Sequence, residues 1–249
     1  MKNTFISDLD GTLVYSKEPN HICIEKKGDK EITYITKSSM SKLDILLNKV
    51  EFIPCSMRSK EQINRIDFIR KYNPKYMIAC NGASIYINGE KDEKWEQHIR
   101  SIVPQSEIKN LIKEVENLNF PTTLIYNVED YFLAVSFSTK EEASFYVDKM
   151  KHLAPSKDYL VYSINRKVYF INKHINKAFA VDYLNNNYDL GKIHTAGDTL
   201  VDKDFTGLNY VQAYLPKHAE FINDKAYITK SSGINALDEL LDELLKRIS

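Results

Sequence analysis

The residues with the clearest chemical potential are two pairs of acids, each of which follows a short apolar run. Asp8 and Asp10 belong to Asp8-Leu9-Asp10-Gly11-Thr12, and Asp198 and Asp202 belong to Gly197-Asp198-Thr199-Leu200-Val201-Asp202. If both runs are strands of one parallel sheet, their carboxyl ends bring four carboxylates to one edge. That much negative charge is costly without a cation, and Mg²⁺ prefers oxygen ligands. The pattern predicts a Mg²⁺ site; the alternatives are an Asx-rich turn and acids that cap a helix.

Two further residues could hold a phosphate beside these acids. Ser56 follows a second apolar run and offers a hydroxyl donor, while Lys177 lies in the first turn of a predicted helix. Backbone N–H groups at a helix N-terminus also favour an anion. The alternatives are a helix or turn cap for Ser56 and an ordinary solvated lysine for Lys177.

The elements that would position these groups form an α/β fold. Strands are expected at 4–6, 51–55, 76–80 and 193–196, and a hairpin at 22–35. One helix is expected after a cap at Ser38 or Ser39. Another is expected after a Ser59/Gln62 capping box, with Ile63, Ile66 and Ile69 on one face. Two more are expected over about 175–187 and 237–248. The core is assigned to 1–84 and 173–249.

The segment 85–172 has a different texture and is assigned to a smaller inserted α+β domain. Strand-like runs at 122–127, 131–137, 158–164 and 166–171 surround helices at about 108–118 and 139–150. Thr139 and Glu142 form a capping box for the second of these helices. Strands joined mainly by hairpins are typical of such a domain.

Composition excludes several classes of function. The chain of 249 residues has 34 basic and 34 acidic side chains, so it lacks the basic excess of a nucleic-acid binder. No apolar run reaches the ~18 residues that a membrane span needs, and the acidic N-terminal segment does not resemble a signal peptide. Three cysteines without metal-ligand spacing indicate reduced thiols and a cytoplasmic protein.

The motifs together resemble those of the haloacid dehalogenase superfamily. Asp8-Leu-Asp-Gly-Thr-Leu13, Ser56, Lys177 and Gly197-Asp198-(three residues)-Asp202 match its four motifs in order. The insert follows Cys80-Asn81-Gly82-Ala83, which looks like the Cof-type and sucrose-phosphate-phosphatase-like branch, whose α/β cap is inserted there. The resemblance implies a Rossmann-like parallel-sheet core with a cap, and the hairpin at 22–35 looks like the flap of the superfamily.

The resemblance also implies roles for the motif residues. Asp8 is the nucleophile that forms an aspartyl-phosphate, and Asp10 is the general acid and then the general base. Asp8, the backbone carbonyl of Asp10, and Asp198 bind Mg²⁺, with Asp202 binding directly or through water. Ser56 and Lys177 hold the phosphoryl oxygens.

The substrate-binding candidates are Arg58, Asn81, Arg166 and Lys167. Arg166 and Lys167 flank the last strand of the cap, where they could contact a phosphorylated sugar. The simpler alternative for either of them is solvated surface charge.

The chain departs from the usual family pattern at three places. The second motif reads Ser56-Met57-Arg58 where Thr-Gly-Arg is usual, so the hydroxyl is kept while methionine narrows the approach of the backbone to a ligand. Val201 stands where the fourth motif often has Asn, which removes one polar contact. Lys217-His218-Ala219 replaces a frequent Gly-Asn-Ala.

These observations predict a Mg²⁺-dependent phosphatase that hydrolyses a small phosphorylated metabolite, such as a sugar phosphate, through an aspartyl-phosphate. A phosphomutase or phosphotransferase of the same superfamily is one alternative, because this cap type also occurs in phosphomannomutases. A non-catalytic sensor of a phosphorylated ligand is the other, since a fold alone does not fix function. The protein is expected to bind neither nucleic acid nor membrane and to be a monomer or weak homodimer.

Overall fold

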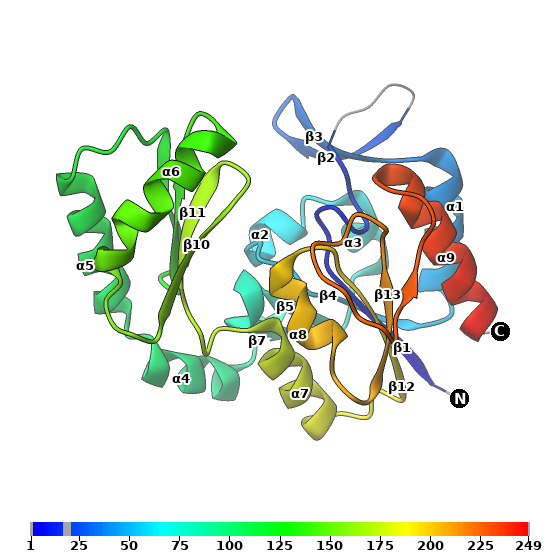
Figure 1. Cartoon of the computed structure of the whole chain (residues 1–249). Helices are drawn as coiled ribbons and strands as arrows, with labels where there is room; N and C mark the ends of the chain where they lie inside the picture. The colour runs from blue at the N-terminus through cyan, green and yellow to red at the C-terminus, as the bar shows by residue number, and fades with distance from the viewer. Residues whose placement is uncertain (1, 17–20, 249) are drawn as a thin grey trace. The chain divides into compact units, whose positions relative to one another are not determined.

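The computed structural model describes residues 2–16 and 21–248, which form two compact units. The first unit comprises Met1–Asp92 and Asn176–Ser249, and the second comprises Glu93–Ile175 (Figure 1). The predicted α/β fold is confirmed, because the first unit holds a parallel sheet and the second holds a smaller antiparallel one.

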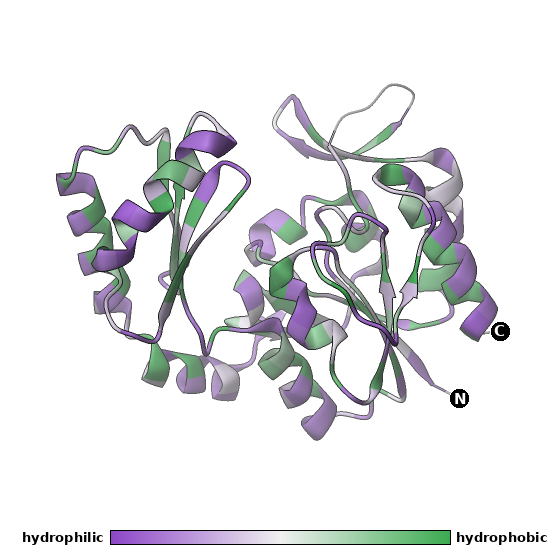
Figure 2. Cartoon of the chain, viewed as in Figure 1, coloured by the Kyte–Doolittle hydropathy of each residue, from purple (hydrophilic) through white to green (hydrophobic). Residues whose placement is uncertain are grey.

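The first unit is built on a five-stranded parallel sheet with the strand order β14-β13-β12-β1-β4. Its strands are β1 (Asn3–Ser7), β4 (Glu51–Pro54), β12 (Lys192–Ala196), β13 (Val211–Leu215) and β14 (Tyr227–Ile228). Strands β1, β4 and β12 are buried along almost their whole length, as parallel strands usually are, whereas the edge strand β14 is partly exposed; Figure 2 shows hydrophobic residues along the sheet. Strand β1 lies inside the sheet between β12 and β4, so the loops that follow β1 and β12 are neighbours.

Helices cover both faces of this sheet. Helices α1 (Lys37–Leu47) and α9 (Ile234–Ile248) pack together on one face, where Lys42 forms ion pairs with Asp238 and Asp242. Helices α7 (Lys177–Asn187) and α8 (Lys203–Thr206) pack together on the other face (Figure 1). The side chain of Thr36 caps α1, so the predicted cap at Ser38 or Ser39 is wrong by two residues or more.

The single helix predicted after Ser59 is divided into α2 (Lys60–Ile63) and α3 (Asp67–Tyr72). The Ser59/Gln62 capping box is present, but Ile66 is extended and becomes the residue that precedes α3. The break has a physical cause: the backbone of Ile66 pairs with Glu25 of the neighbouring hairpin. The apolar spacing of Ile63, Ile66 and Ile69 thus reflects shared burial rather than one continuous helix.

The predicted hairpin consists of β2 (Ile22–Lys27) and β3 (Lys30–Ile35). It is joined to the loop after β1 by two backbone hydrogen bonds between Tyr15 and Tyr34, of 3.0 and 2.8 Å. The ladder has irregular register around Glu25, which marks a β-bulge.

The first unit also contains a small antiparallel sheet of β5 (Tyr76–Ala79), β6 (Ser84–Ile87) and β7 (Glu90–Lys91). The compact units divide after Asp92 and after Ile175, whereas the sequence placed the insert at 85–172. The shift arises because β6 pairs with β5 and the Asp92 N–H donates to the Ile85 carbonyl, which ties this hairpin to the core.

The second unit has a four-stranded antiparallel sheet with the order β10-β11-β9-β8. Its strands are β8 (Leu124–Val128), β9 (Phe132–Ser136), β10 (Tyr159–Ile164) and β11 (Lys167–Asn172), and its long helices are α5 (Gln105–Asn117) and α6 (Lys140–Met150). The Thr139/Glu142 capping box is present. Helix α4 (Glu93–Ile102) was not predicted, because it buries only two apolar side chains. No helix among residues 2–16 and 21–248 is long and apolar enough to cross a membrane.

Candidate active site

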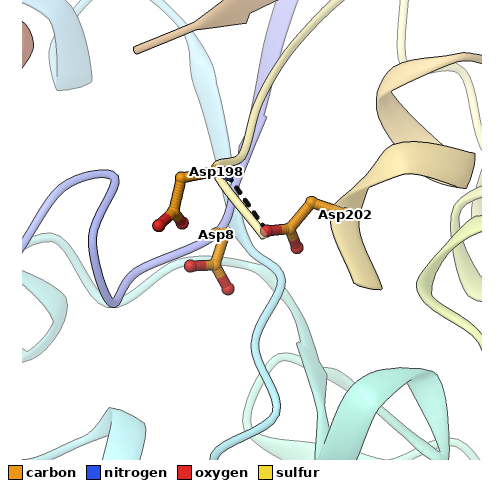
Figure 3. Close-up of side chains that lie close together, drawn as sticks. All are labelled: Asp8, Asp198 and Asp202. Atoms are coloured by element: carbon orange, nitrogen blue, oxygen red, sulfur yellow. Dashed lines mark hydrogen bonds between the residues drawn. The ribbon is translucent and has the colours of Figure 1, made fainter. Parts of the chain in front are cut away.

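Three acids from two neighbouring strands converge in the first unit. Asp8 directly follows β1, while Asp198 and Asp202 lie beyond β12, and the Asp8 N–H donates to the Ala196 carbonyl between the two strands. Figure 3 shows the three carboxylates pointing toward one another. One oxygen from each lies within 4.8 Å of the others, and all three residues are buried. The predicted meeting of four carboxylates at one sheet edge is thus observed for Asp8, Asp198 and Asp202, whereas the Asp10 side chain lies outside this cluster.

Lys177 is the cation inside this cluster. It is the first residue of α7, where Asn176 caps the helix, and it is completely buried. Its Nζ lies 2.6 Å from Asp8 Oδ1 and 2.6 Å from Asp202 Oδ1. Burial alone lowers the pKa of this amine, but the charges of Asp202 and Asp8 raise it overall. The alternative of a solvated lysine is therefore wrong.

Both carboxylate oxygens of Asp202 accept hydrogen bonds from groups of the protein. Oδ1 accepts from Lys177, and Oδ2 accepts from the Asp198 N–H at 3.1 Å and from the N–H and hydroxyl of Thr199 at 3.0 and 2.9 Å. A Cβ at Gly197 would overlap the Asp202 side chain, so glycine is required for this close turn. Asp202 consequently orients the lysine and the loop that carries Asp198.

Asp198 lies against the loop after β1. Its Oδ1 accepts from the Thr12 hydroxyl at 3.0 Å, and its Oδ2 lies where a Cβ on Gly11 would be. Gly11 has φ +83°, so glycine suits this position for both conformation and space. Thr12 belongs to the first motif, but its hydrogen bond to Asp198 was not predicted.

The electrostatics of the cluster favour a bound cation. Burial, followed by the charge of Asp202, raises the pKa of Asp198 to about 7. Burial also raises the pKa of Asp8 well above its usual range, although Lys177 opposes the shift. Three carboxylates against one ammonium leave an excess of buried negative charge. These oxygen donors fit the implied Mg²⁺, which Asp8 and Asp198 could ligate directly.

Ser56 and Asn81 lie on adjoining turns beside the cluster. Ser56 is buried after β4, its N–H donates to the Ile78 carbonyl, and its carbonyl accepts from the Asn81 N–H. Asn81 is buried and left-handed at φ 59°. At the next residue, Gly82, a Cβ would overlap the backbone of Asn176, which immediately precedes Lys177. The structure therefore brings Ser56, Asn81 and the start of α7 to the same region.

Asp10 lies outside the buried triad and is paired with Arg58. The Asp10 side chain is 55% exposed, and its two oxygens accept from Arg58 Nε and Nη2, each at 2.6 Å. A third donor of the guanidinium, Nη1, contacts the buried carboxylate of Glu25 at 2.8 Å. Arg58, a candidate substrate ligand, thus has three donors engaged by carboxylates in this structure.

The remaining two candidates, Arg166 and Lys167, belong to the second unit. They occupy the turn between β10 and β11 and the first residue of β11, and both are exposed. They are not among the residues that the first unit gathers around Asp8, so their role in substrate binding stays a prediction.

His218 and Tyr15 complete the rim and received no site role from the sequence. His218 Nδ1 accepts from the Gly233 N–H at 3.0 Å, which assigns the proton to Nε2, and Nε2 donates to the Gly11 carbonyl at 2.9 Å. The same Nε2 is 4.0 Å from Asp198 Oδ2. The Tyr15 hydroxyl donates to the Thr12 carbonyl at 3.0 Å. The departure at Lys217-His218-Ala219 was the available signal for His218.

Comparison with known proteins identifies the family. A model of the sucrose-6F-phosphate phosphohydrolase family matches residues 1–214. The chain therefore belongs to the sucrose-6F-phosphate phosphohydrolase family. This family lies in the predicted branch of the haloacid dehalogenase superfamily, and the predicted enzyme class, a phosphoric monoester hydrolase, is confirmed with it. No curated protein sequence matches the chain significantly.

Solved structures show that the fold of this family member is shared along the whole chain. The sucrose-phosphatase of Synechocystis sp. PCC6803, solved with sucrose and phosphate, is 14% identical with a TM-score of 0.66 and 98% coverage of both chains. A haloacid dehalogenase-like hydrolase from Bacteroides thetaiotaomicron is 14% identical with a TM-score of 0.64, covering 98% of this chain and 100% of that one. The trehalose-6-phosphate phosphatase of Aspergillus fumigatus is 14% identical with a TM-score of 0.57, covering 99% and 93%.

Proposed function

We propose that this protein is a Mg²⁺-dependent phosphatase that hydrolyses a sugar phosphate through an aspartyl-phosphate at Asp8. The observation that carries the proposal is the placement of Asp8. One of its oxygens is fixed by the buried Lys177 at 2.6 Å, and its carboxylate faces those of Asp198 and Asp202. An oriented carboxylate beside a cation site is what nucleophilic attack on phosphorus requires.

Asp8 acts as the nucleophile, and Asp10 transfers protons. An Asp8 oxygen bonds to phosphorus while the bond from phosphorus to the sugar oxygen breaks. Asp10, protonated on one oxygen in exchange for one of its two Arg58 hydrogen bonds, gives that proton to the sugar oxygen. A water molecule then attacks phosphorus, the bond to Asp8 breaks, and Asp10 takes the proton of the water. The 55% exposure of the Asp10 side chain suits a group that must meet both the leaving group and water.

Asp8, Asp198 and the backbone carbonyl of Asp10 are the groups that would hold Mg²⁺, with Asp202 acting through water because its own oxygens are occupied. When bound, the cation neutralises phosphate charge and helps to orient the displacement. Lys177 offsets the negative charge that Asp8 and the phosphoryl group share, and Ser56 offers a hydroxyl to a phosphoryl oxygen.

The sugar phosphate is proposed as substrate from family membership. The matching family is named for sucrose-6F-phosphate, and two proteins of the same fold are a sucrose-phosphatase and a trehalose-6-phosphate phosphatase. The second unit, with Arg166 and Lys167, is proposed to recognise the sugar, and the first unit to carry out the phosphate chemistry.

The test is hydrolysis of a panel of sugar phosphates, including sucrose phosphate, alongside 4-nitrophenyl phosphate. We expect turnover with Mg²⁺, none after chelation, and none for Asp8→Asn. Intact-mass measurement should detect a phosphorylated enzyme in the wild type and not in the variant. Because asparagine is almost isosteric, the variant should keep the fold, and a single cooperative urea transition in Mg²⁺-free buffer shows that it is folded.

Undiminished turnover in Asp8→Asn would refute the proposed nucleophile. Turnover that depends on an added sugar bisphosphate, with phosphate moved between positions and not released, would instead indicate a mutase. Ligand binding without turnover of any phosphate ester would indicate a sensor.

A further inference from the structure

The hairpin β2–β3 contributes a buried acid that the phosphatase mechanism does not use. The Glu25 side chain is completely buried, although it lies on a hairpin rich in exposed charge. Its Oε1 contacts Arg65 Nε at 3.0 Å, and its Oε2 contacts Arg58 Nη1 at 2.8 Å and the Thr33 hydroxyl at 3.0 Å. Buried charge is costly unless it is paired, so this carboxylate is held by a dedicated set of donors.

The backbone is shaped to place Glu25 inward. Side chains of a strand alternate between two faces, yet Ile24 and Glu25 are consecutive and both buried. The β-bulge at Glu25 breaks the alternation and redirects the side chain. The Glu25 backbone also pairs with Ile66, which fixes the hairpin beside the segment that carries Arg65.

Arg58 connects Glu25 to the acid–base residue. A guanidinium is planar with its donors in a fixed fork, so fixing one donor restricts the direction of the others. Here Nη1 is bound by Glu25, while Nε and Nη2 both meet Asp10 at 2.6 Å. The planar group therefore transmits the position of the buried carboxylate to Asp10.

We propose that Glu25 is a positioning residue for catalysis, which acts through Arg58 to hold Asp10 in place for proton transfer to the leaving group. The inference rests on the proposed function of Asp10. Glu25 contacts no residue of the triad, and its one link to the site, Arg58, is bound to Asp10, so its contribution should be largest where Asp10 is used.

The leaving group provides the specific readout. Protonation matters for a sugar alkoxide and hardly at all for 4-nitrophenolate, which leaves unprotonated. The parameter kcat/KM includes only steps up to the first irreversible one, the loss of the leaving group. We expect Glu25→Gln to lower kcat/KM at least about tenfold for a sugar phosphate and less than about threefold for 4-nitrophenyl phosphate. The tenfold loss is a fraction of the roughly 10²- to 10⁴-fold that general acid catalysis usually contributes.

Two further variants separate positioning from general structure. Arg65→Gln removes another partner of the same buried carboxylate without touching Arg58 or Asp10, so both substrates should keep near wild-type kcat/KM. Glu25→Asp retains the charge, and it should recover part of the loss seen with Glu25→Gln. Urea unfolding ranks the stability of all three, so that lost folding is distinguished from lost positioning.

A double-mutant cycle with Asp10→Asn decides the matter. If Glu25 works through Asp10, Glu25→Gln should have little further effect on sugar phosphate turnover once Asp10 is replaced. If Glu25→Gln does not fold, Glu25→Asp, which keeps the charge but shortens the side chain that reaches Arg58, enters the cycle in its place.

Equal losses for both substrates, losses matched by Arg65→Gln, or additive effects with Asp10→Asn would each overturn the proposal for Glu25. These outcomes are distinct from failure of the proposed function, in which wild-type protein would hydrolyse neither substrate.

Discussion

The stability of the metal-free protein should depend on the charge of Asp198 in a direction opposite to that of most acids. Burial and Asp202 raise the pKa of Asp198 to about 7, whereas a carboxyl in the unfolded chain titrates near 3.9. Between these values the native state binds more protons than the unfolded state. Stability is therefore fully present below the unfolded pKa and is lost as pH rises toward 7.

The perturbation is Asp198→Asn, which removes the ionisable group and keeps an oxygen that can accept from Thr12. Each pKa unit corresponds to 1.36 kcal/mol. Relative to a neutral side chain, Asp198 therefore lowers the free energy of unfolding of the wild type by up to about 4 kcal/mol at pH 8 and by about 1.5 kcal/mol at pH 5. The variant should be more stable than the wild type by roughly these amounts. Relief of the repulsion on Asp8 adds to the gain in the same direction.

The assay is urea unfolding of both proteins in chelator, at intervals from pH 5 to pH 8. Asp29→Asn, which neutralises an exposed acid on the hairpin turn, is the control and should follow the wild type. Mg²⁺ at a hundred times its Kd should narrow the difference at pH 8 to roughly 1–2 kcal/mol, because it stabilises the wild type by about 2.7 kcal/mol and the variant has lost a ligating charge. Equal stabilities at pH 8 in chelator would show that Asp198 is not destabilised by its surroundings.

Three other substitutions test the remaining parts of the argument. Lys177→Met should abolish turnover and, at pH 8, destabilise the metal-free protein by about 3–5 kcal/mol in urea unfolding, because breaking a buried pair leaves uncompensated charge. Gly11→Ala should weaken Mg²⁺ binding, measured by calorimetry, because its Cβ would displace Asp198; unchanged affinity would contradict the assigned packing. Burial lowers the pKa of His194 to about 4, so this residue should contribute a loss of up to about 3 kcal/mol as pH falls from 6.5 to 4, measured as the difference between the wild type and His194→Gln. In His194→Gln that loss should be absent from pH-dependent unfolding curves.

The sequence was sufficient to predict that Asp8 and Asp198 lie at one edge of the sheet, because their positions follow from general rules. Asp8 and Asp198 follow apolar runs, and parallel strands end at a common edge. The burial of Lys177 was not predictable in this way, since a lysine in the first turn of a helix is usually solvated. Only the tertiary placement of α7 against Asp202 and Asp8 explains it.

Glu25 could not be found from the sequence for a different reason. It lies between Ile24 and Lys26 in a hairpin whose alternation predicts an exposed acid. A bulge of one residue turns the Glu25 side chain to the buried face instead. The bulge depends on pairing with the partner strand, so it cannot be predicted from the sequence of this strand alone. The helix break at Ile66 has the same origin, because it depends on pairing with Glu25 and not on the local sequence.

The position of β1 between β12 and β4 has a consequence for how the protein folds during synthesis. Strand β1 is synthesised first, but its neighbour β12 begins only at Lys192, after the whole second unit has been translated. At ordinary rates of protein synthesis the ribosome needs about 10 to 40 s to span that interval. Throughout this time Phe5 and Ile6 lack one of their two flanking strands. The nascent chain is therefore expected to depend on chaperones, and pauses in translation before Lys192 should lower the yield of folded enzyme.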